Sequence, residues 1–117
     1  TARLRQIVQK IETTMEMPSG AEPLEEYRRY YAWSEQDGRR VVEGHFLRYG
    51  GPDPSEDVES VPGLDRAYIW RERFLPRIMD GGCNMVTVYF DVEADALVGL
   101  KQRDSVETGL GLCNGFA

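Results

Sequence analysis

The feature that most constrains the fold is the alternation of side chains over residues 85–92 (MVTVYFDV). One side of this segment is apolar, and the other side mixes polar and apolar groups. The apolar side holds Val86, Val88, Phe90 and Val92, and the mixed side holds Met85, Thr87, Tyr89 and Asp91. A period of two, with β-branched and aromatic residues, predicts a strand that buries one face.

A second short strand is expected over residues 96–101, after a three-residue loop at 93–95. This pairing sets Phe90 opposite Val98. A shift by one residue would bring Phe90 against Gly99 and strip the core face of its partners, so we reject that alternative. The two strands are therefore predicted to form a hairpin at the centre of a sheet.

An earlier hairpin is predicted around the dipeptide Asp37-Gly38, which favours a two-residue turn. Such a turn sets Gln36 opposite Arg39 and fixes the register of both strands. The core face then consists of three facing pairs: Arg29 with Phe46, Tyr31 with Gly44 and Trp33 with Val42. The tyrosine ring would cover the bare glycine backbone.

Apolar residues near the N-terminus recur at the spacing of an α-helix. They are Leu4, Ile7, Val8, Ile11 and Met15. This pattern predicts an amphipathic helix that ends before Pro18. We expect its apolar stripe to cover one face of the sheet; a dimer seam and a membrane surface are the alternatives, and the net charge of −6 argues against anionic lipid.

Between the hairpins lies a segment rich in proline, glycine and acids, residues 50–64 (GGPDPSEDVESVPGL), which predicts a flexible acidic loop. It lacks the spacing of acidic ligands that a calcium loop needs. A short strand is expected at 67–70 (AYIW).

These elements together predict one domain over residues 1–117 with an α+β fold. An N-terminal amphipathic helix packs on an antiparallel sheet of four or five strands, formed by two hairpins with a short strand between them. The arrangement resembles cystatin-like or related curved-sheet folds. A likeness of fold carries no function.

Charge and hydropathy exclude two classes of partner. The protein is acidic and has no basic stripe, so we expect no nucleic acid as a partner. No run approaches the roughly 18 apolar residues of a membrane span, so no membrane is expected either. The chain begins at Thr1 rather than Met, which leaves open whether a leader was removed.

Three pieces of the sequence occur together: YRRYYAW with DGRRVVEGHF, then FLPRIMDGGCNMVTVYFDV, then CNGFA. In this combination the chain resembles a family of small, uncharacterised bacterial proteins with YxRYYA…GRR, DGGC…YD and CNG motifs, which also occur in mobile gene cassettes of the integron type. The resemblance covers residues 23–117 and implies neither an activity nor site residues. One departure is that residues 102–112 separate the CNG piece from the second hairpin.

Cys83 and Cys113 are the only cysteines. They lie near the ends of neighbouring strands, so a disulfide is geometrically allowed; the inserted residues 102–112 leave the pairing open. A bridge would place the protein in the periplasm or among exported proteins, whereas free thiols would indicate the cytoplasm. Two cysteines and one histidine do not make a structural zinc site, so we expect no metal and no cofactor.

The best candidate for a binding site is the second face of the first hairpin, where Tyr30 lies opposite His45 and where Arg28 and Glu43 are nearby. Tyr68 and Trp70 of the short strand extend the set with two aromatic rings. We predict a non-catalytic module that binds a small molecule or a protein through this face, with a homodimer as the expected assembly. A plain solvated sheet face is the simpler alternative.

The alternative from a different class is a small enzyme. It would use His45 with Tyr30 and Glu43, or His45 with Cys83 as a nucleophile. No nucleophile motif supports the cysteine version.

Overall fold

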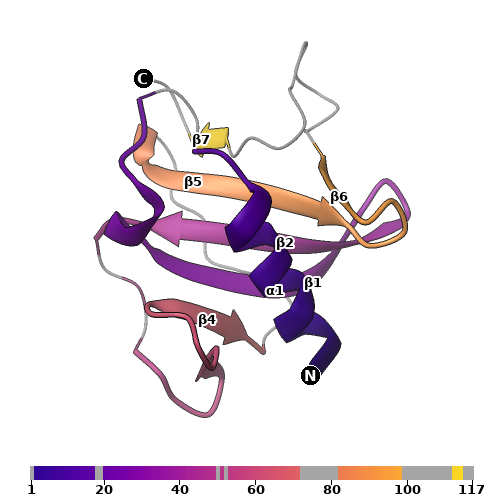
Figure 1. Ribbon diagram of the computed structural model, residues 1–117, viewed down its shortest axis with the longest axis horizontal. Coiled ribbons are helices and arrows are strands. Elements are labelled where there is room, and N and C mark those ends of the chain that lie inside the picture. The colour runs from indigo at the N-terminus through magenta and orange to yellow at the C-terminus, as the bar shows by residue number, and fades with distance from the viewer. Residues whose placement is uncertain are drawn as a thin grey trace.

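The computed structural model describes residues 2–17, 20–49, 51, 53–71, 82–98 and 112–114. Within these residues, one helix, α1 (Ala2–Thr14), and one 3-10 turn, η1 (Leu24–Glu26), accompany a single sheet (Figure 1). The strands are β1 (Arg28–Gln36), β2 (Arg39–Leu47), β3 (Val58–Ser60), β4 (Ala67–Trp70), β5 (Gly82–Asp91), β6 (Ala96–Val98) and β7 (Leu112–Asn114). The prediction of an α+β fold with an N-terminal helix is confirmed.

The described strands run in the order β3-β4-β1-β2-β5-β6, and β7 pairs with β5 beside this path. In the described part of the chain the sheet has seven strands rather than the four or five that we predicted. It is mixed rather than antiparallel, because β4 lies parallel to β1, while the other neighbours are antiparallel.

The extra strands come from segments in which the sequence pattern did not predict a strand. β3 lies inside 50–64, for which we predicted a loop, and it pairs with β4 as an antiparallel hairpin. Val58 and Val61 are both buried. β2 runs antiparallel to β1, and the β3–β4 hairpin reverses the chain direction once more. β4 therefore lies beside β1 and runs in the same direction. β7 returns part of the C-terminal segment to the sheet.

The first hairpin has the predicted register, with Gln36 opposite Arg39 and Tyr31 opposite Gly44. Both turn residues have positive φ, 54° at Asp37 and 76° at Gly38. This is the conformation of a type I′ turn, whose twist matches that of the two strands. The dipeptide therefore determines the register of β1 and β2, and with it the face on which each side chain lies.

The helix covers one face of the sheet and lies across β1 and β2 (Figure 1). Its buried residues are Leu4, Ile7, Val8 and Ile11. They pack against an apolar face that includes Tyr31, Val42, Phe46, Ile69, Val86, Val88, Phe90 and Leu97. The predicted stripe is thus core packing, and no helix in the described part of the chain is long and apolar enough to cross a membrane.

The second hairpin differs from the prediction by one residue. Phe90 faces Leu97 rather than Val98, so the loop has four residues, 92–95. This register places Leu97 in the core. The predicted extension of the strand to residue 101 lies outside the described residues.

Asp91 explains the longer loop. Its Oδ1 accepts hydrogen bonds from the backbone N–H groups of Glu93 (3.0 Å) and Ala94 (3.1 Å). Asp95 then adopts φ 55°, which aspartate tolerates better than most residues. A turn capped by a side chain in this way does not appear in a count of alternating residues.

The Asp91 carboxylate makes stability depend on pH. Its pKa is held below the ordinary 3.8, first by the hydrogen bond from Arg39 and then by the N–H of Ala94. A carboxyl whose folded pKa is lowered stabilises the fold above its unfolded pKa and loses that effect as the pH falls through its folded pKa. We expect Asp91→Asn to lower the melting temperature more at about pH 7 than at about pH 2.5.

The control is Glu35→Gln, at an exposed carboxylate on β1. Its effect should be small at both pH values. An equal loss for Asp91→Asn at both pH values would contradict the role given to the charge.

Gly44 is required by packing. A Cβ at this position would lie 2.7 Å from Cγ2 of Val88 and 2.9 Å from Cε1 of Tyr31. Neither group can move easily, because the valine is stiff at χ1 and the tyrosine hydroxyl is hydrogen-bonded. We expect Gly44→Ala to lower the free energy of unfolding by about 1–3 kcal/mol in urea denaturation. A change within error would show that the sheet relaxes around the added methyl group.

Candidate functional site

The structure brings all six predicted site residues to one face of the sheet, opposite the helix. Strand alternation and the register of β1 with β2 and β4 place them there. They are Arg28, Tyr30, Glu43, His45, Tyr68 and Trp70. The pairing of three strands thus places all six residues on one face, and whether they form a site stays a prediction.

This face is not the solvated surface of the simpler alternative. Tyr30 is 1% exposed, His45 2% and Glu43 6%. Apolar neighbours on the same face, Ala32, Leu47, Val58 and Met85, are buried as well. The sheet thus separates two buried layers, of which the helix covers only one.

A buried pair of titratable groups lies in this second layer. Nε2 of His45 is 2.5 Å from Oε2 of Glu43, and both side chains come from the same face of β2. On β5, Thr87 lies opposite His45 and Tyr89 lies opposite Glu43. The Glu43–His45 pair is therefore held between two strands at the centre of the sheet.

Three aromatic rings extend this layer from Tyr30, which lies opposite His45, across β1 to β4. The rings of Tyr30 and Tyr68 stack at 5.2 Å with an interplanar angle of 22°. Trp70 meets Tyr30 edge to face at 5.9 Å. Tyr68 and Trp70 are half-buried. We call these rings, together with Arg28, the aromatic patch.

Arg28 lies over two of the rings, 5.2 Å from the centroid of Tyr68 and 5.9 Å from that of Tyr30. Its Nη1 donates to the carbonyl of Gly51 (3.1 Å) and its Nη2 to Oδ1 of Asp53 (3.0 Å). The pKa of Arg28 is raised, chiefly by hydrogen bonding with the Tyr68 side chain. Partial desolvation lowers this pKa, and the hydrogen bond with Asp53 raises it again. Arg28 is thus a fixed cation at the rim of the patch.

The loop after β2 closes tightly on Tyr30. Gly51 has φ +91°, and a Cβ there would lie 2.5 Å from the Tyr30 hydroxyl oxygen. Burial is the main reason that the pKa of Tyr30 is raised, and Arg28 opposes it. Only a residue without a side chain allows the backbone to approach this closely.

One polar atom of the patch is left without a partner. Trp70 Nε1 is buried and has no hydrogen bond in the part of the chain that the structure describes. A buried donor in this state costs about 1–3 kcal/mol relative to a paired one. Within the described part of the chain, Trp70 Nε1 is therefore a polar atom of the patch that is free to donate to an added acceptor.

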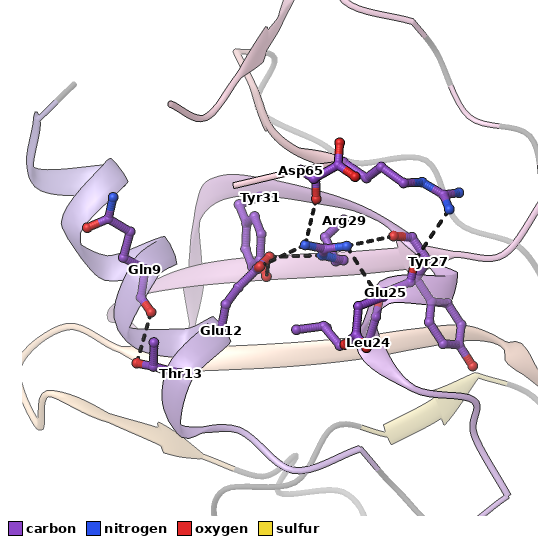
Figure 2. Close-up of polar contacts among 10 residues, drawn as sticks. Gln9, Glu12, Thr13, Leu24, Glu25, Tyr27, Arg29, Tyr31 and Asp65 are labelled. Atoms are coloured by element: carbon purple, nitrogen blue, oxygen red, sulfur yellow. Dashed lines mark hydrogen bonds and ion pairs between the residues drawn. The ribbon is translucent and has the colours of Figure 1, made fainter. Parts of the chain in front are cut away.

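A second polar cluster was missed by sequence analysis. Figure 2 shows Arg29 between α1, η1 and the segment before β4. Nε and Nη2 donate to the two carboxylate oxygens of Glu12 at 3.0 and 2.8 Å. Tyr31 donates its hydroxyl hydrogen to the same carboxylate at 2.7 Å.

The remaining donors of Arg29 bind backbone carbonyls. The acceptors are Leu24 and Tyr27 for Nη1 and Asp65 for Nη2. All five N–H groups of the guanidinium are thereby used. No donor is left for a ligand, so we assign this cluster to the fold rather than to a binding site.

The pKa values agree with a structural role. Burial and the adjacent Glu12 carboxylate raise the pKa of Tyr31 well above its ordinary value. Burial lowers the pKa of Arg29, but the hydrogen bonds and charge of Glu12 outweigh it, so the net direction is upward. A sequence signal existed: Glu12 follows Val8 by four residues and therefore lies on the apolar side of the helix.

The cysteines of the enzyme and disulfide hypotheses are only partly placed. β5 and β7, which contain Cys83 and Cys113, are neighbours, and the register sets Cys113 opposite Val86. The side chains of both cysteines lie outside the described residues. Among the residues that the structure describes, no three His, Cys, Asp or Glu side chains gather as metal ligands.

Comparisons with protein-family models, with curated proteins and with solved structures give no match for this chain.

The Glu12–Arg29 ion pair gives a prediction for stability. Removing one partner of a buried, bidentate pair leaves the other charge uncompensated. We expect Glu12→Ala to lower the free energy of unfolding in urea by about 3–5 kcal/mol. The double variant Glu12→Leu/Arg29→Met should recover much of this loss, because it leaves no buried charge. A loss typical of surface substitutions in the single variant would contradict the anchoring role.

Proposed function

We propose that this chain is a non-catalytic module that binds a small molecule at the aromatic patch, next to the Glu43–His45 pair. The observation that carries the proposal is the burial of this pair in a layer that also holds aromatic and apolar side chains. The patch supplies flat apolar surface, and the pair supplies polar groups that fix orientation, as in most small-molecule sites.

The cost of the pair supports this interpretation. Removing a carboxylate and an imidazole from water is expensive, and a hydrophobic pair of similar volume often stabilises a core as well or better. Stability alone is therefore a weak reason for these two side chains on β2. Recognition of a ligand gives them a use that offsets the cost.

The homodimer expectation was based on an uncovered sheet face. Because Tyr30, Glu43 and His45 are buried in the single chain, ligand binding does not require a second copy. We keep the dimer as a proposal for some other surface, to be decided by native mass spectrometry. The likeness to small bacterial cassette proteins and the likeness to cystatin-like sheets are likewise proposals. The cellular compartment is a proposal too, and a count of free thiols at Cys83 and Cys113 tests it.

A small enzyme is the second candidate, and one observation favours it. The Glu43 carboxylate contacts a ring nitrogen of His45, as an orienting carboxylate does beside a general base. Tyr30 lies opposite His45 on the neighbouring strand. A compound that is consumed rather than only bound, with turnover abolished by His45→Ala in a protein that still folds, would favour this candidate.

The binding proposal is tested by a thermal-shift screen of small aromatic compounds. The chain has two tryptophans, and they lie on opposite faces of the sheet: Trp70 in the patch and Trp33 against the helix-side core. We expect compounds that raise the melting temperature of the wild type to lose most of this effect with Trp70→Phe, because the indole ring and its N–H are removed.

Trp33→Phe is the matched control, since Trp33 is also half-buried, and Arg40 lies over its ring at 4.2 Å much as Arg28 lies over the two tyrosine rings of the patch. Ligand responses should survive this substitution. A screen in which no compound stabilises the wild type, or in which both variants respond alike, would contradict the proposed site.

A further inference from the structure

The rim of the aromatic patch carries an ion pair whose two partners differ widely in their exposure to solvent. The Arg28 side chain is 19% exposed and is held against two tyrosine rings, whereas the Asp53 side chain that pairs with it is 90% exposed. The two groups are joined by one hydrogen bond from Nη2 to Oδ1. The cation is therefore positioned by the sheet, and the anion is offered by a solvated loop.

Such a pair is easily exchanged. Ion pairs with an exposed partner contribute little to stability, because water and salt compete with them. A carboxylate from solution that also gains contacts with Tyr68 and Trp70 would replace Asp53 at small cost. Arginine suits this role, because its planar fork binds carboxylates in two-point geometry.

The polar atoms of the patch indicate the sign of the charge on the ligand. Arg28 is a cation, and Trp70 Nε1 is a buried donor without a partner in the described part of the chain. Both contact the ring of Tyr30, Arg28 from above and Trp70 edge to face. Donors around one ring call for a ligand that presents acceptor oxygens beside a flat apolar body.

Resting on the proposed function, we infer that the ligand is an aromatic or similarly flat carboxylate, that Arg28 binds its carboxylate, and that Asp53 occupies this position in the free protein. Asp53 thereby competes with the ligand and sets its affinity. The indole N–H of Trp70 donates to a ligand oxygen.

The test compares benzoate with its uncharged isostere benzamide, using the indole N–H signals of ¹⁵N-labelled protein. The chain has only two tryptophans, and Trp33→Phe assigns the Trp70 signal. We expect benzoate to shift the Trp70 signal at lower concentration than benzamide does. Asp53→Asn should raise the affinity for benzoate by about two- to fivefold, because the competing charge is removed.

Arg28→Gln should weaken benzoate at least about tenfold, since a charge-assisted hydrogen bond is lost, while benzamide stays within about twofold. Asp57→Asn is the matched control for Asp53→Asn. It makes the same change of charge at an exposed position of the same loop, and within the described part of the chain Asp57 makes no hydrogen bond or ion pair with Arg28.

The two levels of failure are distinguishable. If benzoate and benzamide shift the Trp70 signal equally, and Asp53→Asn acts like Asp57→Asn, the inference about the carboxylate is overturned and the binding site stands. If neither compound shifts the Trp70 signal at millimolar concentration, the proposed function fails for flat aromatic ligands and the inference fails with it.

Discussion

The bidentate contact between Arg29 and Glu12 holds the molecule together across its layers. One guanidinium joins α1, η1, the start of β1 and the segment before β4 (Figure 2). Because every N–H of Arg29 has an acceptor, the charge is buried without an unpaired group, which is the condition under which a buried ion pair is tolerated. The helix is thereby placed on one particular face of the sheet.

This placement determines what the other face can do. With the helix on the side of Tyr31 and Phe46, the side chains of Tyr30 and His45 point to the opposite layer, where the loop at Gly51 and Asp53 closes against the patch. A packed helix leaves little room for a ligand on its side of the sheet. The loop and the aromatic rings on the other side have a partly exposed rim that a ligand can reach. The candidate site is thus a consequence of which face the helix covers.

Much of this could be predicted from local patterns. The turn at Asp37-Gly38 sets a register that carries Tyr30 to His45 and Tyr31 to Gly44, and the periodicity of the helix gives its buried stripe. Interactions between distant residues could not be predicted in this way. The Asp91 cap shifts the second hairpin by one residue, β3 forms only because β4 offers an edge, and Arg29 finds its anion in a helix that precedes it by many residues. Of these elements, β3 also contributes the buried Val58 to the layer of the candidate site.

The central claim is that ligand binding at the aromatic patch reaches the Glu43–His45 pair. His45 is the only histidine, so its ring protons give one unambiguous set of NMR signals. The most direct measurement follows these signals while benzoate is added to the wild-type protein. We predict that they shift in parallel with the Trp70 indole signal and reach a limit at the same concentration. Ring protons of His45 that stay in place while the Trp70 signal moves would restrict binding to the rim and contradict the role given to the buried pair.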